Sequence, residues 1–288
     1  MTVLEVIQKS ADFLAGRGVE SPRLQTELLL AHVLGLPRMQ LYLNFTRELA
    51  PAELDALREL VRRRGRREPL QHIVGSVSFC GLDLAVNRHV LVPRPETEML
   101  AELGWQFLAE STTSDPGSPA VLDFGTGSGC IAIALAVHSP NARITALDVS
   151  ANVLVVARQN ALRHGVDNRI QFLQSDGFTA VSEGSAFNLL VSNPPYIPTG
   201  EIALLQPEVR DHDPRAALDG GADGLDFFRR LASQGRAQLR PAGRILVELG
   251  DGQADAAQEI FTSQKWIVEA LKNDYTRRPR FLMGRLGR

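Results

Sequence analysis

The strongest constraint on the fold is a regular alternation of predicted strands and helices that begins at Ala120. Ala120–Phe124 is typical of a buried strand, and residues 129–138 are typical of an apolar helix. The alternation continues with strands at 143–149, 170–173 and 189–192, and with a helix from Ser150 to about His164. Because strands that alternate with helices form parallel sheets covered on both faces, we expect an α/β fold for this region.

The C-terminal segments add three further strands, at 244–249, 266–271 and 280–286. The last two can pair as an antiparallel hairpin at the edge of the sheet. Residues 111–119, with the sequence STTSDPGSP, are rich in turn-forming residues and predict a solvated connection before the sheet begins.

The first seventy residues predict a small helical module. Apolar residues recur at helical spacing in three segments, which are 3–14, 22–35 and 54–60. This stretch contains no pattern of residues typical of a catalytic site, so we expect it to serve as an accessory or recognition module.

Between the helical module and the α/β region, the hydrophobic period changes to two. The change lies between about Val74 and Val86, with Cys80-Gly81 as a plausible turn, and it predicts a β-hairpin that joins two domains. We therefore expect a helical recognition domain over 1–72, a hairpin linker over 73–92 and an α/β domain over 93–288.

Composition describes an ordinary globular chain, with 44% hydrophobic and 22% charged residues. The net charge of −2 argues against a protein whose main affinity comes from neutralising many phosphates of a duplex. Two cysteines are too few for a disulfide framework or a cysteine-rich zinc site, and we expect no metal. The longest apolar stretch, 130–137, is far below the roughly 18 residues of a membrane span. Since the N-terminus also lacks a secretory signal pattern, we expect a cytoplasmic protein without a membrane partner.

A glycine-rich loop follows the first strand of the alternation and consists of Gly125, Thr126, Gly127, Ser128 and Gly129. Glycine at every second position lets the backbone turn tightly and approach a ligand, and the helix N-terminus behind it favours an anion. Cys130 breaks the spacing of a dinucleotide fingerprint, and the lysine of a phosphate-binding loop is missing. The remaining match is the loop of methyltransferases that bind S-adenosylmethionine, in which the methionine carboxylate is the anion.

Two carboxylates follow the next two strands. Asp148 stands 148 − 127 = 21 residues after Gly127, where a carboxylate can accept both ribose hydroxyls of a nucleoside. Asp176, or a neighbouring backbone group such as that of Gly177, can meet the adenine. We expect both aspartates to contact the cofactor rather than to act only as helix caps or loop carboxylates.

The run Asn193-Pro194-Pro195-Tyr196, which follows an apolar strand, indicates the reaction. The prolines remove backbone donors and stiffen the loop, so the Asn193 side-chain oxygen and the Pro194 carbonyl can point together as two acceptors. Two acceptors at a fixed separation suit a planar NH₂ group, whose nitrogen they would aim at a sulfonium methyl while stabilising positive charge arriving on it. Tyr196 supplies a face on which a planar group can stack.

With these motifs, the whole sequence resembles the peptide-chain release-factor glutamine methyltransferases of the HemK/PrmC type. It shares with them four further runs, which are EPLQHIVG at 68–75, VPRPETE at 92–98, SDGF at 175–178 and LDGGADG at 218–224. The similarity extends from the N-terminal helices to the final strand. These four runs are specific, whereas the glycine loop and the Asn-Pro-Pro-Tyr run also occur in other methyltransferases.

The resemblance implies a fold and an activity. The fold is α/β, a class I methyltransferase with a Rossmann-like, seven-stranded, mostly parallel sheet and an antiparallel edge hairpin, preceded by a small all-α domain and a β-hairpin linker. The activity is transfer of a methyl group from S-adenosylmethionine, leaving S-adenosylhomocysteine, to the side-chain nitrogen (N5) of the glutamine in the Gly-Gly-Gln tripeptide of peptide chain release factors. This methylation modulates translation termination, so release factors are the expected partners and direct nucleic-acid binding is not expected.

The motifs and the resemblance together predict the site residues. The expected cofactor contacts are Gly125, Thr126, Gly127, Ser128, Gly129, Asp148, Asp176, Gly177 and Asn193. The expected substrate contacts are Asn193, Pro194, Pro195 and Tyr196, with Asn193, Pro194 and Tyr196 as the catalytic residues.

Two features leave questions open. Gly177 stands where many members of the family carry an aromatic residue, so stacking on the adenine must come from elsewhere, and Phe178 is one candidate. The basic stretch from Arg62 to Arg67 can form either a solvated helix end or a patch that faces a partner.

Two other functions compete with glutamine methylation. An amino methyltransferase acting on adenine in DNA or RNA also uses a proline-rich run of this kind, but it would normally carry a target-recognition domain and a basic surface. A non-catalytic adaptor could bind the cofactor only as a stabiliser, but it has no need for the two converging acceptors near Asn193.

Overall fold

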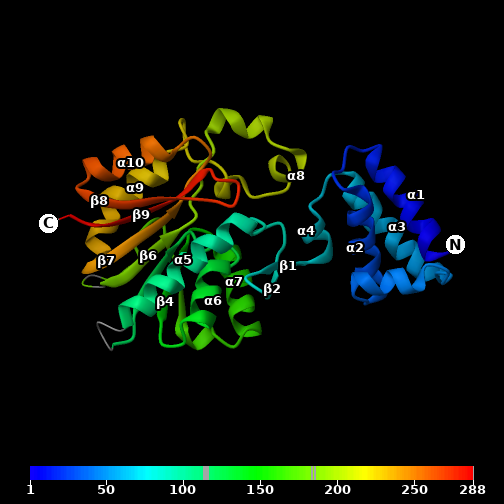
Figure 1. Cartoon of the computed structure of the whole chain (residues 1–288), viewed down its shortest axis with the longest axis horizontal. Coiled ribbons are helices and arrows are strands. Elements are labelled where there is room, and N and C mark those ends of the chain that lie inside the picture. Colours follow the sequence, from blue (N-terminus) through cyan, green and yellow to red (C-terminus); the bar gives the residue numbers. More distant parts are fainter. Residues whose placement is uncertain (113–116, 183, 185, 288) are drawn as a thin grey trace. The chain divides into compact units, whose positions relative to one another are not determined.

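The computed structural model describes residues 1–112, 117–182, 184 and 186–287 (Figure 1). The chain forms two compact units. Residues 1–76 and 205–212 make up the helical unit, and residues 77–204 and 213–288 make up the α/β unit. The boundaries expected at 72 and 92 stay predictions, whereas the inclusion of 205–212 in the helical unit is a feature that we did not expect.

The helical unit is built from short helices around an apolar core. Its helices before the hairpin are α1 (Val3–Ala15), α2 (Pro22–Leu34), η1 (Arg38–Asn44), α3 (Pro51–Gly65) and α4 (Leu70–Val74). A capping box between Thr2 and Glu5 begins α1, and proline begins α2 and α3, where the missing amide proton costs nothing. The buried residues at helical spacing, among them Ile7, Leu14 and Leu57, form one cluster.

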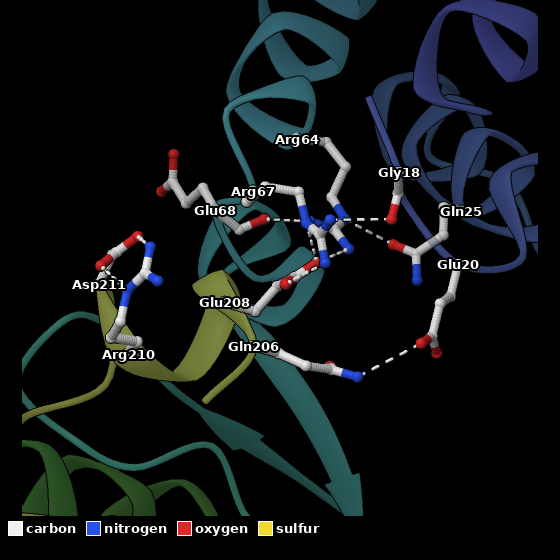
Figure 2. A network of polar contacts seen from close by, with 10 residues as sticks. All are labelled: Gly18, Glu20, Gln25, Arg64, Arg67, Glu68, Gln206, Glu208, Arg210 and Asp211. Carbon is white, nitrogen blue, oxygen red and sulfur yellow. Dashed lines mark hydrogen bonds and ion pairs between the residues drawn. The ribbon is translucent and has the colours of Figure 1, made fainter. Parts of the chain in front are cut away.

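The basic stretch at the end of α3 is paired within the helical unit. Figure 2 shows the carboxylate of Glu208, on the short helix α8 (Pro207–Arg210), beside the guanidinium groups of both Arg64 and Arg67. Arg67 holds both carboxylate oxygens at 2.6 Å, and Arg64 donates to one of them at 2.8 Å. Arg63 forms a second two-pronged pair with Glu68, at 2.9 and 2.5 Å.

The remaining donors of these arginines are also used. Arg64 donates to the side-chain oxygen of Gln25 at 2.8 Å and to the carbonyl of Glu68, and Arg67 donates to the carbonyl of Gly18 (Figure 2). Because the Arg64 side chain is only 5% exposed, its charge requires such partners. Five of the six arginines between 58 and 67 therefore form ion pairs within the chain. The pairs of Arg58 and Arg62 are exposed, as at a solvated helix end, whereas those of Arg63, Arg64 and Arg67 are at least partly buried.

We expect Glu208→Gln to lower the free energy of unfolding of the helical unit by roughly 2–3 kcal/mol, because it leaves two arginines without their shared anion. Burial alone raises the pKa of the Glu208 carboxyl, but hydrogen bonds from Arg67 and Arg64 outweigh it and lower the pKa to about 2. The stabilisation is therefore complete above the ordinary value of 4.5 and is lost as pH falls toward 2.

Hydrogen exchange of the α3 amides in the intact chain measures this effect. The matched control is Asp211→Asn, because Asp211 pairs with its exposed neighbour Arg210, and exposed ion pairs of this kind contribute little to stability. Equal protection of α3 in the two variants would show that the Glu208 pairs do not stabilise the unit.

The predicted hairpin is formed by β1 (Ser76–Phe79) and β2 (Leu82–Ala85), and all of it except Ser76 belongs to the α/β unit. Cys80 and Gly81 both have positive φ, of 50° and 75°, as the tight turn between twisted strands requires. The buried side chain of Asn160 joins the hairpin to the glycine loop, since it exchanges two hydrogen bonds with the backbone of Ala85 and donates to the carbonyl of Ser128.

A seven-stranded sheet, counted over the described residues, forms the centre of the α/β unit, with the order β5-β4-β3-β6-β7-β9-β8. Its strands are β3 (Ala120–Phe124), β4 (Arg143–Asp148), β5 (Ile170–Gln174), β6 (Phe187–Ser192), β7 (Leu239–Glu248), β8 (Trp266–Asn273) and β9 (Pro279–Leu286). The pairs from β5 to β7 are parallel, and β9 runs antiparallel to both β7 and β8. The predicted fold class, including the antiparallel edge hairpin, is confirmed.

Helices cover both faces of the sheet, as Figure 1 shows. One face packs against α5 (Pro95–Thr112), α6 (Cys130–His138) and α7 (Ala151–Arg163), and the other against α9 (Asp226–Gln234) and α10 (Ala254–Ser263). Alternate residues of β3 enter the two cores, with Val121 in one and Leu122 in the other, as the two-residue period of a strand dictates.

Some helices differ from the expectations from sequence, and so do several element boundaries, such as the start of β7, which lies at Leu239 and not at 244. Helices α9 and α10 were not predicted, and neither was α8. The connection expected at 111–119 begins too early, since α5 continues to Thr112, and residues 113–116 lie outside the described residues. None of the described helices is both long enough and apolar enough to cross a membrane.

Candidate active site

The glycine-rich loop lies between the end of β3 and the start of α6. Gly125, Gly127 and Gly129 have φ of 73°, 57° and 83°, which other residues adopt only with strain. A Cβ on Gly125 or Gly127 would meet open space, so these two positions require glycine for backbone conformation alone. At Gly129 a Cβ would approach Ala157 on α7 to 3.2 Å, so this glycine also permits close helix packing.

Asp123, the fourth residue of β3, binds the glycine-rich loop through a side-chain hydrogen bond. Its carboxylate accepts a hydrogen bond from the Thr126 hydroxyl at 2.7 Å, and the whole side chain is buried. Burial raises the pKa of Asp123 to about 7, against the opposing effect of Thr126. The loop is therefore anchored to the sheet by a side chain that the site prediction did not include.

Asp148 ends β4 beside the glycine loop. One carboxylate oxygen accepts from the Gly127 amide at 3.1 Å, and the other accepts from the Ser150 amide at 3.0 Å. The pKa of this carboxyl is raised above its ordinary value, because the effect of burial outweighs the backbone hydrogen bonds that lower it. Each oxygen has a second lone pair, so the carboxylate can bind the loop and a pair of ligand hydroxyls together.

Asp176 and Gly177 follow β5 and meet Arg230 of α9. The Arg230 guanidinium donates to Asp176 at 2.7 Å, and a Cβ on Gly177 would come within 2.2 Å of it. The guanidinium therefore occupies the place that a side chain at 177 would take. Phe178 instead lies in the core, with its ring centroid 4.9 Å from that of Phe124, so the structure does not support it as the stacking residue.

The loop after β6 is backed by residues 218–224, the LDGGADG run of the sequence. Ile197 exchanges backbone hydrogen bonds with Leu218 and Gly220, at 3.0 and 2.9 Å. A Cβ on Gly220 would lie 2.9 Å from the Pro195 carbonyl oxygen. A Cβ on Gly224 would lie 2.4 Å from the Tyr196 carbonyl oxygen. The two glycines thus let backbone pack directly against the proline-rich loop and hold its shape.

Tyr196 is fixed at its backbone and partly buried at its ring. Its carbonyl accepts from the Gln253 side chain at 2.8 Å, and its ring packs with the core on the α9 and α10 face of the sheet. Burial raises the pKa of the Tyr196 hydroxyl to about 12, so the group stays protonated at neutral pH.

Asn193 belongs to a chain of three polar side chains from three elements. Its side-chain nitrogen donates to the Thr97 hydroxyl at 3.0 Å, and that hydroxyl donates to Glu248 at 2.8 Å. Thr97 lies in the first turn of α5, and Glu248 is the last residue of β7. Thr97 and Glu248 are both buried.

A cavity of about 360 Å³ in the α/β unit brings most of the predicted residues together. The predicted residues that line it are Gly125, Thr126, Gly127, Ser128, Asp148, Asp176, Gly177, Asn193 and Pro195. Its described lining does not include Gly129, Pro194 or Tyr196. The volume lies within the range of roughly 300 to 1,000 Å³ that small-molecule sites occupy.

Thr97, Arg230 and Glu248 belong to the site or support it, although none of them is among the residues predicted from sequence. Thr97 stands in the VPRPETE run, and this run is the one sequence signal that could have indicated it. Arg230 and Glu248 lie in segments whose sequence carries no comparable motif. Among the described residues, no group of three or more His, Cys, Asp or Glu side chains is arranged to hold a metal ion.

Comparison with known proteins adds an independent line of evidence. Residues 5–75 match the family model of the PrmC N-terminal domain, and residues 101–205 match that of the methyltransferase small domain. A release factor glutamine methyltransferase of Geobacter sulfurreducens is 46% identical over 261 residues, which cover 91% of this chain and 88% of the relative. Another, of Deinococcus radiodurans, is 38% identical over 99% of both chains.

Solved structures show the same fold at lower identity. A methyltransferase of Pyrococcus furiosus superposes with a TM-score of 0.53 at 19% identity, over 79% of this chain and 99% of that one. At this identity the likeness concerns the fold alone.

Proposed function

The chain belongs to the release factor glutamine methyltransferase family, and we propose that Asn193 and the Pro194 carbonyl hold the side-chain amide of the substrate glutamine beside S-adenosylmethionine bound in the cavity. The enzyme transfers a methyl group to the side-chain nitrogen of a glutamine in release factors. The assignment of individual residues to this reaction is our proposal.

The residues around the cavity fit S-adenosylmethionine. The open side of Gly125 and Gly127 leaves room for the methionine carboxylate next to the backbone amides of the loop. The partly buried carboxylate of Asp148 suits the two ribose hydroxyls, and Asp176 with Arg230 suits the adenine end. When bound, the cofactor supplies an electrophilic methyl group on a sulfonium.

The substrate amide needs help because its nitrogen lone pair is delocalised, as in any planar amide. The Asn193 side-chain oxygen and the Pro194 carbonyl would each accept one N–H of the glutamine NH₂ group. This grip orients the nitrogen toward the methyl group, and the two oxygens stabilise the positive charge that develops on that nitrogen.

The proposed step balances without a dedicated base. The glutamine nitrogen forms a bond to the methyl carbon as the sulfur–carbon bond breaks, and the sulfur keeps the electron pair. The methylated amide nitrogen, protonated and therefore strongly acidic, then releases its proton to water. The residues of this chain therefore position the two reactants and stabilise the positive charge that develops on the glutamine nitrogen.

One observation supports this proposal above the others. Asn193 lines the same cavity as Gly127 and Asp148, and its nitrogen is already occupied by Thr97. The side-chain oxygen of Asn193 is therefore the group that can accept a hydrogen bond from the substrate. A cofactor-binding adaptor has no use for an oriented acceptor at this place.

Transfer from isotopically labelled S-adenosylmethionine tests the proposed function. The protein is incubated with a folded release factor, with DNA, with RNA or with no acceptor, and mass spectrometry locates the label. We expect one methyl group on the glutamine of the Gly-Gly-Gln tripeptide. Label on nucleic acid would instead favour the adenine methyltransferase, and cofactor binding without any transfer would favour the adaptor.

A further inference from the structure

The polar chain from Asn193 to Glu248 has a defined direction. A hydroxyl has a single proton, and an ionised carboxylate can only accept. Thr97 must therefore give its proton to Glu248, 2.8 Å away, which leaves its oxygen to act as an acceptor toward Asn193. The Asn193 group that lies 3.0 Å from Thr97 is then its NH₂ and not its carbonyl.

This direction matters because the two ends of an asparagine amide are nearly equal in size. Which end faces which neighbour is decided by hydrogen bonding rather than by shape. If Asn193 were turned by 180°, its NH₂ group would face the NH₂ group of the substrate glutamine, and two donors would oppose each other.

We propose that Glu248, acting through the Thr97 hydroxyl, is a positioning residue that keeps the carbonyl oxygen of Asn193 directed at the substrate amide. This inference rests on the proposed function. Glu248 itself does not line the cavity, so its effect on the reaction passes through Thr97 and Asn193.

The surroundings of Glu248 make this positioning sensitive to pH. The side chain is 1% exposed, and burial raises its pKa to about 7 although Thr97, Arg280 and Tyr196 favour the charged form. Glu96, on α5, adds a like charge that raises the pKa further. These groups come from α5, β9 and the loop after β6.

Protonation would remove the fixed direction. A neutral carboxyl can donate to the Thr97 oxygen, and the Thr97 proton is then free to turn toward Asn193, which allows the reversed amide. Because the correct direction needs the ionised form, kcat should fall as pH drops below about 7 and should level off above it.

The experiment compares Thr97→Val, Thr97→Ser and Glu248→Gln in the full chain with a release factor as substrate. Valine matches threonine in shape but neither donates nor accepts, so we expect kcat to fall by about 10- to 100-fold, as is typical when an outer hydrogen-bond partner is removed. The dissociation constant for S-adenosylmethionine should change by less than about threefold. Serine restores the hydroxyl and should recover most of the rate.

Glu248→Gln provides a readout that a purely structural role would not affect. Glutamine can accept from Thr97 but cannot ionise, so the fall in kcat between about pH 8 and about pH 6 should disappear, whatever the absolute rate. The matched control is Thr26→Val on α2, which changes a buried threonine whose hydroxyl has no hydrogen-bond partner among the described groups. This control should transfer methyl groups at the wild-type rate.

The outcomes separate the inference from the proposed function. Wild-type turnover by Thr97→Val, or an unchanged acidic fall in Glu248→Gln, would overturn the positioning role while leaving glutamine methylation intact. If Thr97→Val does not fold, the pH profile of Glu248→Gln decides alone. If the wild-type chain methylates no release factor, the proposed function itself fails.

Discussion

Asn193→Ala is expected to lower methyl transfer to a release factor by about 10²- to 10³-fold, the usual loss when one preorganised polar group at a reacting centre is removed. Alanine removes the acceptor that would hold one N–H of the glutamine, and it also leaves Thr97 without its donor. The loss should appear mainly in kcat, because orientation of the amide and stabilisation of its developing charge are transition-state effects.

The measurement combines single-turnover transfer with calorimetric titration of S-adenosylmethionine. The cofactor dissociation constant should stay within about threefold of the wild-type value, because the glycine loop and Asp148 are untouched. Asn188→Ala is the matched control, since Asn188 lies on the same strand, β6, and accepts from the Ala120 amide at 2.9 Å. This control should cost about 1 kcal/mol of stability and leave transfer intact. Undiminished turnover by Asn193→Ala would rule out the proposed grip on the amide.

Asp148→Asn should weaken binding of S-adenosylmethionine and of S-adenosylhomocysteine by about 10- to 100-fold. The carboxylate accepts from the amides of Gly127 and Ser150, and it is the proposed acceptor for both ribose hydroxyls. An asparagine can accept through only one of its two ends, and its NH₂ group would face a backbone N–H. The variant therefore loses ligand contacts and disturbs the loop together.

Titration calorimetry of both ligands measures the effect directly. Asp251→Asn is the matched control, because Asp251 forms an exposed pair with Arg278 and does not line the cavity. Equal affinity of the two variants for S-adenosylmethionine would show that Asp148 does not bind the ribose. Because both Asp148→Asn and Asn193→Ala lower turnover, only the binding measurement distinguishes their causes.

The parts of the fold that could be predicted from the sequence depend on local patterns. An apolar run bounded by turn residues forms a strand in many contexts, so β3 and β6 were found near their observed ends. The hairpin turn at Cys80 and Gly81 was recognised for the same reason. Helices α9 and α10 were missed although Phe228 and Leu231, and likewise Ala257 and Phe261, repeat at helical spacing and are buried.

The glycine loop and the carboxylates were predictable because each belongs to a short run next to a strand. Parallel strands bring their carboxyl ends to one edge, so residues that follow β3, β4 and β6 had to converge. The direction of the Asn193 amide was not predictable, since its partner Thr97 lies 96 residues away and Glu248 lies 151 residues from Thr97.

The sequence by itself determined the α/β fold. It also determined that the glycine loop, Asp148 and the proline-rich run lie at the carboxyl ends of strands, because local propensity and strand order suffice for this. Only the tertiary structure decided which carboxylates pair with the basic stretch, since Glu208 comes 141 residues after Arg67 and no local sequence signal connects the two. It also decided that Arg230, not Phe178, meets Gly177, and that a buried carboxylate stands behind Asn193. Buried charges need partners, and which partners they find depends on packing between elements far apart in the chain.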